Sequence, residues 1–194
     1  MFLELFLVAT VVVVGLSLIS EHISPRVAGI ISGAPTGTAI TLFFLGLSQG
    51  PQFAANSAIF NMAGMVAMQS LLFFYYTASS FFKRYTVFLS TAASVAGYLC
   101  VAWLLHQLPI SKELAVVLPL ISILLFMHLF RNIENVKIEK AVKLSPAVLL
   151  FRAILASLII SSIVMVSERV GPSWTGLFSA FPTTLFPLIL ILNL

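Results

Sequence analysis

The stretch Ser20–Thr38 reads SEHISPRVAGIISGAPTGT, and the later stretch Ser167–Leu185 reads SERVGPSWTGLFSAFPTTL. The two stretches are offset by 147 residues and align without a gap, with seven of nineteen positions identical. The identical pairs are Ser20/Ser167, Glu21/Glu168, Pro25/Pro172, Gly29/Gly176, Ser32/Ser179, Pro35/Pro182 and Thr36/Thr183. A lipid environment explains matching Leu and Val residues, but not a shared glutamate, two prolines and a common Gly-x-x-Ser-x-x-Pro-Thr spacing. We therefore interpret the two stretches as copies of one unit.

Around these stretches the chain is strongly apolar. Of its 194 residues, 60% are hydrophobic and only 8% are charged, whereas a soluble domain carries about 25% charged residues. Because so few charges cannot cover a surface in water, we expect a single transmembrane domain comprising residues 1–194. No Lys or Arg precedes the first apolar run, and no A-x-A cleavage pattern follows it. We therefore expect residues 1–20 to be a retained helix and not a signal peptide.

Seven apolar stretches are long enough to cross a bilayer, which predicts an all-α polytopic membrane protein with about seven transmembrane helices. The expected spans are residues 2–20, 27–48, 55–77, 85–105, 114–130, 146–166 and 174–194. The breaks between them are short and polar. Only the break at 131–145 is long enough for a solvated basic loop or an interfacial helix.

The distribution of Lys and Arg predicts the orientation, because basic residues concentrate on the cytoplasmic side. Eight basic residues fall on one side of the predicted spans: Arg26, Lys83, Arg84, Arg131, Lys137, Lys140, Lys143 and Arg152. Only two, Lys112 and Arg169, fall on the other. We therefore expect the loops at 78–84 and 131–145 to be cytoplasmic and the loop at 106–113 to be external. Seven spans then place the N-terminus outside and the C-terminus in the cytoplasm.

The two copies are expected to face opposite ways across the membrane. Five spans separate their starts, and an odd number inverts the second copy, as in the inverted repeats of many secondary transporters. Copy one comprises about residues 1–145, and the partial copy two about 146–194. Copy two lacks later helices, so these are dispensable, supplied by a second chain, or missing because the sequence ends early. The final residues, LILILNL, carry no polar tail, which is expected of an early end.

Each copy places a proline inside a predicted span, so we expect two Pro-broken helices. Pro35 lies eight residues past Val27, about 12 Å along a helix axis, and Pro182 lies eight past Trp174. Since half of the hydrocarbon core is about 15 Å thick, both breaks fall near the midplane. Backbone groups freed by proline cannot face lipid, so they must face protein or a watery cavity.

We predict a substrate site where the two breaks meet, with open backbone groups and hydroxyls from both copies. The predicted substrate-binding residues are Ser32, Pro35, Thr36, Thr38, Asn61, Ser179, Pro182, Thr183 and Thr184. Among them, the hydroxyl of Thr36 or Thr183 is the group that we expect to contact substrate. Each motif taken alone is equally well explained as a simple kink, and Asn61 as a residue that packs against a broken helix.

Several functional classes find no support in the sequence. It contains no hydrolase, metalloprotease or nucleotide-binding motif, so we expect neither an enzyme nor a cofactor. No basic stripe with interleaved aromatics indicates nucleic-acid binding. Met62, Met65 and Met68 follow a helical spacing, but Met is more often a packing residue than a soft-metal ligand, and we predict no metal. Glu21 and Glu168 are expected to be interfacial charges or helix caps.

Two patches resemble the small bacterial GlpM-like inner-membrane proteins. These are RVAGIISGAPTGTAI at Arg26–Ile40, with the following run LGLSQGPQFAANSAIFNMAGM, and TGLFSAFPTTLFPLI at Thr175–Ile189. The resemblance covers about 70 residues and implies a bacterial inner-membrane location and a duplicated origin. This chain departs from the family's pattern, which has four or so spans, by carrying two copies of the motif and more helices.

These observations lead to two functional hypotheses. The first is a transporter or channel-like permease for a small solute or anion, bound near the bilayer midplane between the two broken helices. The alternative is a non-transport scaffold or subunit of a larger membrane complex. Because the second copy is incomplete, we also expect a homodimer, with close contact through the small-residue face Ala92, Val95, Ala96 and Leu99.

Overall fold

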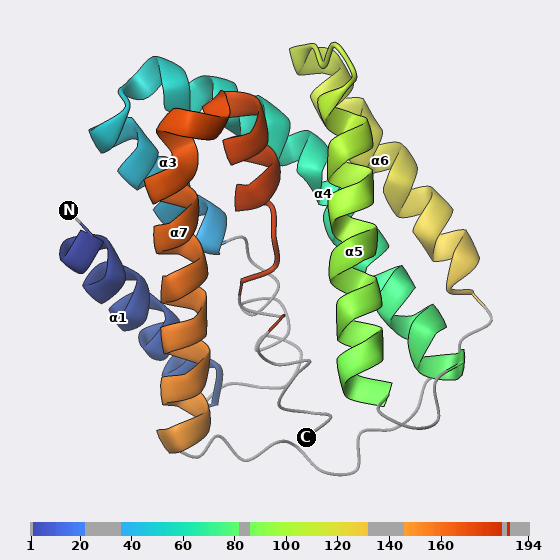
Figure 1. Ribbon diagram of the computed structural model, residues 1–194, viewed down its shortest axis with the longest axis horizontal. Helices are drawn as coiled ribbons and strands as arrows, with labels where there is room; N and C mark the ends of the chain where they lie inside the picture. Colours follow the sequence, from blue (N-terminus) through green and yellow to red (C-terminus); the bar gives the residue numbers. More distant parts are fainter. Residues whose placement is uncertain (1, 22–35, 82–85, 132–145, 184–185, 187–194) are drawn as a thin grey trace.

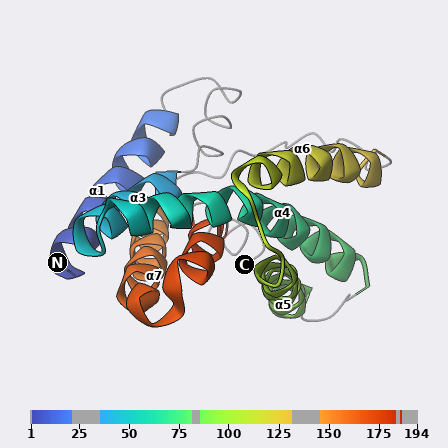
Figure 2. The same cartoon turned by 90° about the horizontal axis from the view of Figure 1, so that it is seen from above.

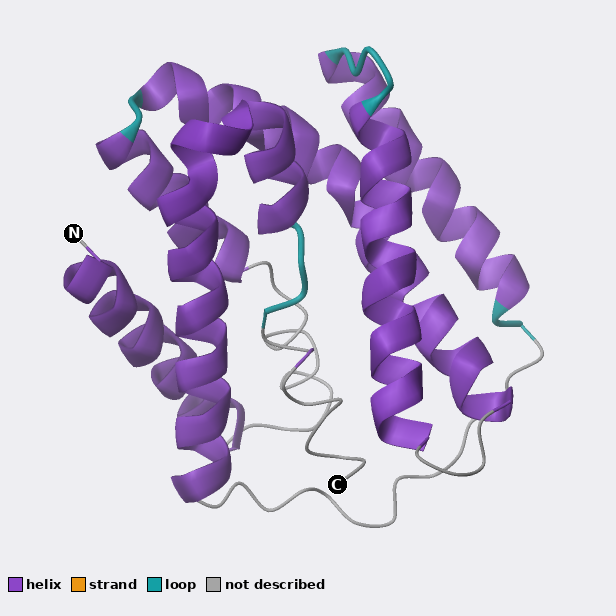
Figure 3. Ribbon diagram, in the orientation of Figure 1, coloured by secondary structure: helices purple, strands orange, loops and turns teal. Residues whose placement is uncertain are grey.

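The described part of the protein is helical throughout. The computed structural model describes residues 2–21, 36–81, 86–131, 146–183 and 186, and among these it contains six helices and no strand (Figures 1 and 3). The helices are α1 Phe2–Glu21, α3 Thr36–Ser48, α4 Pro51–Phe81, α5 Thr86–His106, α6 Lys112–Leu129 and α7 Pro146–Ser179. The expectation of an all-helical chain is therefore confirmed.

Four helices are long and apolar enough to cross a membrane: α4, α5, α6 and α7. Their best windows have a mean hydropathy of 1.5 to 2.4. Many large apolar side chains point outward, most clearly on α6, where Leu120, Ile121 and Leu124 are each more than half exposed. Such a surface is stable against lipid and not against water. The chain is therefore a helical membrane protein.

The helix ends follow local sequence rules. Gly50 adopts φ 90° directly after α3, and Pro51 opens α4, which is the usual order of a glycine after a helix and a proline in the first turn of the next. Ser111 caps α6 by accepting a hydrogen bond from the Leu114 amide at 3.2 Å. The turns between α3 and α4 and between α5 and α6 are consequently tight.

The long helix α7 is two helices joined at Gly171. This residue has φ 76° and ψ 172°, a region that only glycine adopts readily, and Pro172 begins the second part with its fixed φ. The Thr175 hydroxyl donates to the Gly171 carbonyl at 2.7 Å and closes the first turn of that part. We call residues 146–170 α7a and residues 172–179 α7b. In Figure 1 α7b turns back alongside α7a.

The helices pack around α4, which crosses the whole bundle (Figure 2). Seen from above, α5 and α7 lie on one side of α4, and α6 lies on the other. One apolar cluster joins α1, α3 and α7a through residues such as Leu5, Phe44 and Ile160. A second joins α4, α5 and α7b through Leu71, Tyr98 and Leu177. Helix α7 therefore packs against both halves of the bundle, through α7a on one side and α7b on the other.

The expected count of seven spans is wrong for the part of the chain that the structure describes. The predicted spans at 146–166 and 174–194 fall within or beyond one kinked helix, and α7b has only eight residues. The predicted span at 27–48 contributes α3, whose 13 residues rise about 20 Å, less than the roughly 30 Å core. The predicted spans at 55–77, 85–105 and 114–130 correspond to α4, α5 and α6.

The fold does not establish the inverted repeat either. Of the nineteen aligned positions in copy one, only Ser20, Glu21 and Thr36–Thr38 lie within the described residues. Most of Ser20–Thr38, the segment that would have to be superposed on Ser167–Leu185, therefore lies outside the described residues. The C-terminus and the basic loop at 132–145 lie outside them as well.

Candidate functional site

The backbone is open at the end of α7b, around the second Pro-Thr motif. After Ser179 the amides of Ala180 and Phe181 reach back only three residues, to Leu177 at 3.2 Å and Phe178 at 3.0 Å. The Thr183 amide then donates to the Phe181 carbonyl at 2.8 Å, and the Phe186 amide to the Pro182 carbonyl at 2.8 Å. Since Pro182 has no amide hydrogen and cannot continue the ladder, the helix stops here. Pro182 and Thr183 are nonetheless buried.

The start of α3 lies directly against this break. Thr183 is in such close contact with Gly37 that a Cβ atom at position 37 would overlap the Thr183 hydroxyl. One residue further along, the Thr38 hydroxyl donates to the Ser179 carbonyl at 3.0 Å. The residues after the first proline and those around the second are thus neighbours, although they are more than 140 positions apart in sequence.

Asn61 of α4 connects these two segments. Its Nδ2 donates to the Ser179 hydroxyl at 2.8 Å and, more weakly, to the Thr38 hydroxyl at 3.4 Å. The Ser179 hydroxyl in turn donates to the Gly176 carbonyl at 2.8 Å. We call this set of bonds the Thr38–Asn61–Ser179 network. It links three helices through polar groups in an apolar bundle, where such groups need partners.

Small residues let the three helices approach closely enough for this network. A Cβ atom on Gly64 would lie 2.7 Å from the Ala180 Cβ, and one on Gly176 would overlap the Ser57 carbonyl oxygen. Only glycine allows α4 and α7b to meet at this distance. The same crossing could be architecture alone, since closely packed helices in a membrane commonly use small residues and polar bonds.

The network lies near the middle of the bundle. Asn61 is ten residues past Pro51, Thr38 is ten residues before Ser48, and Ser179 is eight past Gly171. Measured along the axis of its own helix, each residue therefore lies about 12–15 Å from that position. Half of a hydrocarbon core is about 15 Å.

The predicted site residues divide into three groups. The structure brings Thr38, Asn61 and Ser179 together, and it places Pro182 and Thr183 beside them. Thr36 is the first residue of α3 and is half-buried. Ser32, Pro35 and Thr184 lie outside the described residues.

Tyr98 is a polar contact of this region that the sequence analysis missed. Its side chain is 1% exposed, and its hydroxyl donates to the Leu177 carbonyl at 2.5 Å. Its ring packs edge-on against Phe181, with centroids 5.2 Å apart. The Leu177 carbonyl, which also accepts the Ala180 amide, belongs to the last turn of α7b, where main-chain acceptors lose their regular helical partners. The sequence did indicate this contact: Tyr98 lies in the predicted span 85–105, and a tyrosine hydroxyl within a membrane needs a hydrogen-bond partner.

A groove of about 450 Å³ runs between α5 and α7 beside the break. Side chains of Phe178, Phe181 and Phe186 form one end, and Leu155, Ile159 and Ile163 of α7a form one wall. Tyr98 and Ser162 carry the only side-chain hydroxyls among the lining residues. The space next to the second Pro-Thr motif is therefore apolar.

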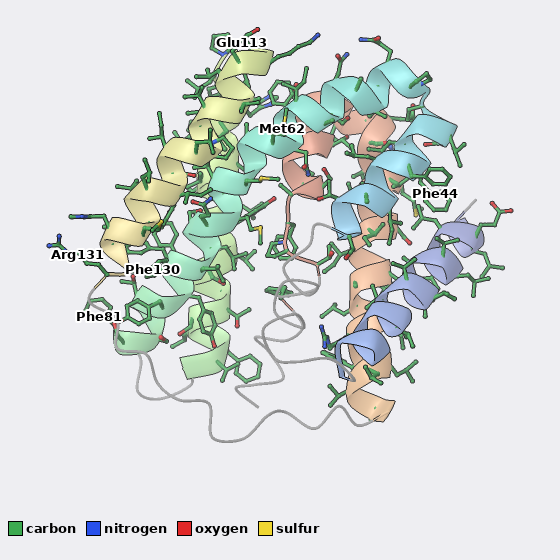
Figure 4. All side chains as sticks on the ribbon, turned by 180° about the vertical axis from the view of Figure 1, so that it is seen from behind. Phe44, Met62, Phe81, Glu113, Phe130 and Arg131 are labelled. Atoms are coloured by element: carbon green, nitrogen blue, oxygen red, sulfur yellow. The ribbon has the colours of Figure 1, made fainter. Side chains whose placement is uncertain are left out.

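The remaining polar candidates lie toward the ends of the helices. The exposed Glu168 accepts a hydrogen bond from Gln49 at 3.0 Å, and His106 stacks on Trp174 at 4.5 Å. Met62 lies toward the upper half of α4 in Figure 4. Among the described residues no group of three or more His, Cys, Asp or Glu side chains could hold a metal ion.

No known protein provides independent information on this site. Comparison of the chain with protein-family models, with curated proteins and with solved structures found no match. The resemblance to GlpM-like proteins therefore stays a prediction, and the function has to be argued from the Pro-Thr segments themselves.

Proposed function

We propose that the chain is a membrane transporter or channel-like permease for a small solute or anion, which binds where the Pro-Thr segments meet. The observation that carries the proposal is the contact between Thr183 and Gly37, with the Thr38–Asn61–Ser179 network around it. Polar groups and an interrupted helix near the midplane are how many transporters build a solute site. A chain that needed only packing would more simply continue the helix.

The proposal includes an inverted repeat. Two observations support it. The Thr10 and Ser157 hydroxyls are hydrogen-bonded at 2.9 Å and are 147 positions apart, which is the offset between the two copies. In addition, α1 and α7a pack side by side and run in opposite directions (Figure 1). Equivalent residues of two inverted copies are expected to meet in this way at the pseudo-two-fold axis.

We further propose that the protein lies in a bacterial inner membrane, with the N-terminus outside and the C-terminus in the cytoplasm. The separation of charges supports a fixed orientation. Figure 4 shows Glu113 and Arg131 at opposite ends of α6, and the adjoining Lys112 lies at the Glu113 end. The location rests on the resemblance, and the direction on the basic residues.

A homodimer is the proposed assembly. Ala92 and Ala96 are exposed on α5 and are small enough for close contact with a second helix. Val95 and Leu99 line the groove between α5 and α7. The proposed dimer contact therefore involves mainly Ala92 and Ala96. Disulfide crosslinking of Ala96→Cys in a Cys100→Ser background should trap a dimer in membranes, and a monomer there would count against it.

A second candidate function, a scaffold or subunit of a larger complex, has its own supporting observation. The hydroxyls of Thr38 and Ser179 are satisfied by protein groups, and the adjacent groove is apolar. Hydroxyl groups that already have hydrogen-bond partners within the protein are expected in a purely structural contact as well as in a binding site.

The two functions can be separated by ligand-induced thermal stabilisation of the purified chain over a broad solute panel. For any stabilising solute, we expect Thr183→Val to weaken the shift, since the change keeps the shape and removes a hydroxyl. The matched control is Thr175→Val, whose hydroxyl donates to the Gly171 carbonyl at the kink of α7 and not to another helix. Loss of one buried polar contact corresponds to about five- to 150-fold in affinity. Equal stabilisation of the parent and both variants would show that the midplane site is wrong and that the Pro-Thr motifs are architecture only.

A further inference from the structure

We propose that the groove between α5 and α7 binds an anionic phospholipid, with an acyl chain along the groove and the headgroup phosphate at Arg152. The proposal does not depend on the transport function. It rests on three observations: an enclosed arginine, an apolar groove on the same helix face, and the match of their separation to one lipid leaflet.

Arg152 is an unusual residue in this bundle. Its side chain is only 7% exposed, and its Nε has no hydrogen-bond partner among the residues that the structure describes. An arginine near the end of a membrane helix normally extends its charge to the headgroup region or water. A guanidinium enclosed by protein instead needs an anion, and its fork of donors matches a phosphate group.

The depth of Arg152 suits a phospholipid headgroup. Helix α7a comprises residues 146–170 and is about 37 Å long, so it exceeds the roughly 30 Å hydrocarbon core by a few ångströms at each end. Arg152 lies six residues past Pro146, which places its Cα about 5 Å inside the hydrocarbon boundary. An arginine side chain is long enough to span that distance to a phosphate at the edge of the core.

The lining of the groove starts at Leu155, three residues after Arg152 on the same helix. Ile159 and Ile163 follow Arg152 by seven and eleven residues, which puts all three on one face of α7a, and both isoleucines line the groove. From Arg152 to Ile163 the helix rises about 16 Å, close to the roughly 15 Å of one leaflet. A positive charge at one end and an apolar channel of leaflet length complement an anionic lipid.

Other occupants explain only part of this arrangement. A free phosphate or carboxylate would engage Arg152 but leave the apolar groove without a role. A second copy of the chain could fill the groove but would leave the enclosed charge unpaired, since the lipid-facing helices present few acidic groups. Basic positions between membrane helices on the cytoplasmic side are where anionic headgroups are commonly held.

The test measures lipids retained by the purified full chain in detergent, using native mass spectrometry. The probes are phosphatidylglycerol and phosphatidylcholine with identical acyl chains, in competition. We expect the parent to retain the anionic lipid about fivefold more than the zwitterionic one. Arg152→Gln should abolish this preference, while Arg169→Gln, at an exposed arginine, should keep it. Ser162→Trp, which fills the groove from an exposed position, should reduce retention of both lipids.

Each outcome decides the proposal. No preference in the parent, a preference that survives Arg152→Gln, or retention unchanged by Ser162→Trp would overturn it. If Arg152→Gln does not fold, the parent competition and the Ser162→Trp result still decide. Millimolar glycerol 3-phosphate should not displace the lipid, and full displacement would show that a soluble phosphate is the true ligand. A dimer that Ser162→Trp breaks, without change in lipid retention, would show that a second copy fills the groove.

Discussion

Asn61 is hydrogen-bonded to residues of two other helices, Thr38 of α3 and Ser179 of α7. The stabilisation that Asn61 provides should therefore depend on the presence of Ser179. We predict that Asn61→Ala and Ser179→Ala are non-additive in a double-mutant cycle, with a coupling of about 0.6 kcal/mol and at most about 2 kcal/mol. Unfolding of the purified chain in mixed detergent micelles measures the free energies. As a control, Ser70→Ala removes a bond only to its own helix, at Ala67, and should show no coupling to Asn61→Ala.

Gly176 is the tightest point of the α4–α7b crossing. Because a Cβ there would meet the Ser57 carbonyl and lie 3.0 Å from the Asn61 amide nitrogen, backbone atoms would have to move. We predict that Gly176→Ala destabilises the fold by about 1–3 kcal/mol. Gly46→Ala, whose Cβ would lie 3.8 Å from Ala54 Cβ, should be neutral or stabilising by up to about 1 kcal/mol. Thermal unfolding of both variants tests this, and equal melting temperatures would contradict the crossing.

At this scale the sequence was informative where polar groups had to be explained. Thr38, Asn61 and Ser179 were predicted as substrate-binding residues at or beside the two Pro-broken segments. The structure brings them together, and their contact with a substrate stays a prediction. The contact of Gly37 with Thr183 and the bond from Tyr98 to Leu177 were not predicted. Both depend on which helix faces which, and no pattern within one segment contains that information.

At the scale of elements, α7 depends on a single backbone conformation. Gly171 has φ 76° and ψ 172°, and its absent Cβ has no atom within 4 Å, so a methyl group there would meet no steric obstacle. We predict that Gly171→Ala nevertheless destabilises the chain by about 1–3 kcal/mol, because an L-residue disfavours this region. The matched control is Gly15→Ala in α1, where the space is also open and the backbone is helical. A stable Gly171→Ala protein would mean that α7b does not turn back at this point.

Element boundaries were predicted well where turn residues mark them. The break at 167–173 contains Gly171 and Pro172, and the predicted spans 85–105 and 114–130 lie within two residues of α5 and α6. Helix α4 instead extends four residues beyond each end of the predicted span 55–77. The number of full spans was overestimated within the described residues because hydropathy does not register where a helix stops, as α7b does at Ser179. The 27–48 stretch contributes a 13-residue α3, and the 174–194 stretch begins with a helix that stops at Ser179.

At the scale of the whole molecule, composition alone determined the membrane class, because 8% charged residues cannot build a water-facing surface. The sequence comparison predicted that the two Pro-Thr segments meet, but it did not predict that α1, α3 and α7 share one apolar cluster. Neither property predicts the function. Hydropathy indicates only that the protein is surrounded by lipid, and a repeat in sequence indicates at most a common origin of two segments.

The orientation of the molecule can be tested at the two ends of one helix. Figure 4 places Glu113 and Arg131 at opposite ends of α6. The positive-inside rule predicts that the end with Arg131 is cytoplasmic, since the adjoining loop carries Lys137, Lys140 and Lys143. In a Cys100→Ser background, we therefore expect Lys112→Cys to be labelled by an impermeant maleimide in intact cells. Arg131→Cys should be labelled only after permeabilisation.

The control for access is that both cysteines react in permeabilised cells. The two positions must give opposite results in intact cells if α6 crosses the membrane, because its 18 residues rise about 27 Å, close to the roughly 30 Å core. Labelling of Arg131→Cys alone would show that the orientation is the reverse of the predicted one. The lipid bound at Arg152 would then belong to the outer leaflet. Labelling of both would remove α6 from the spans, and the basic loop after it would then lie on the same side as Lys112.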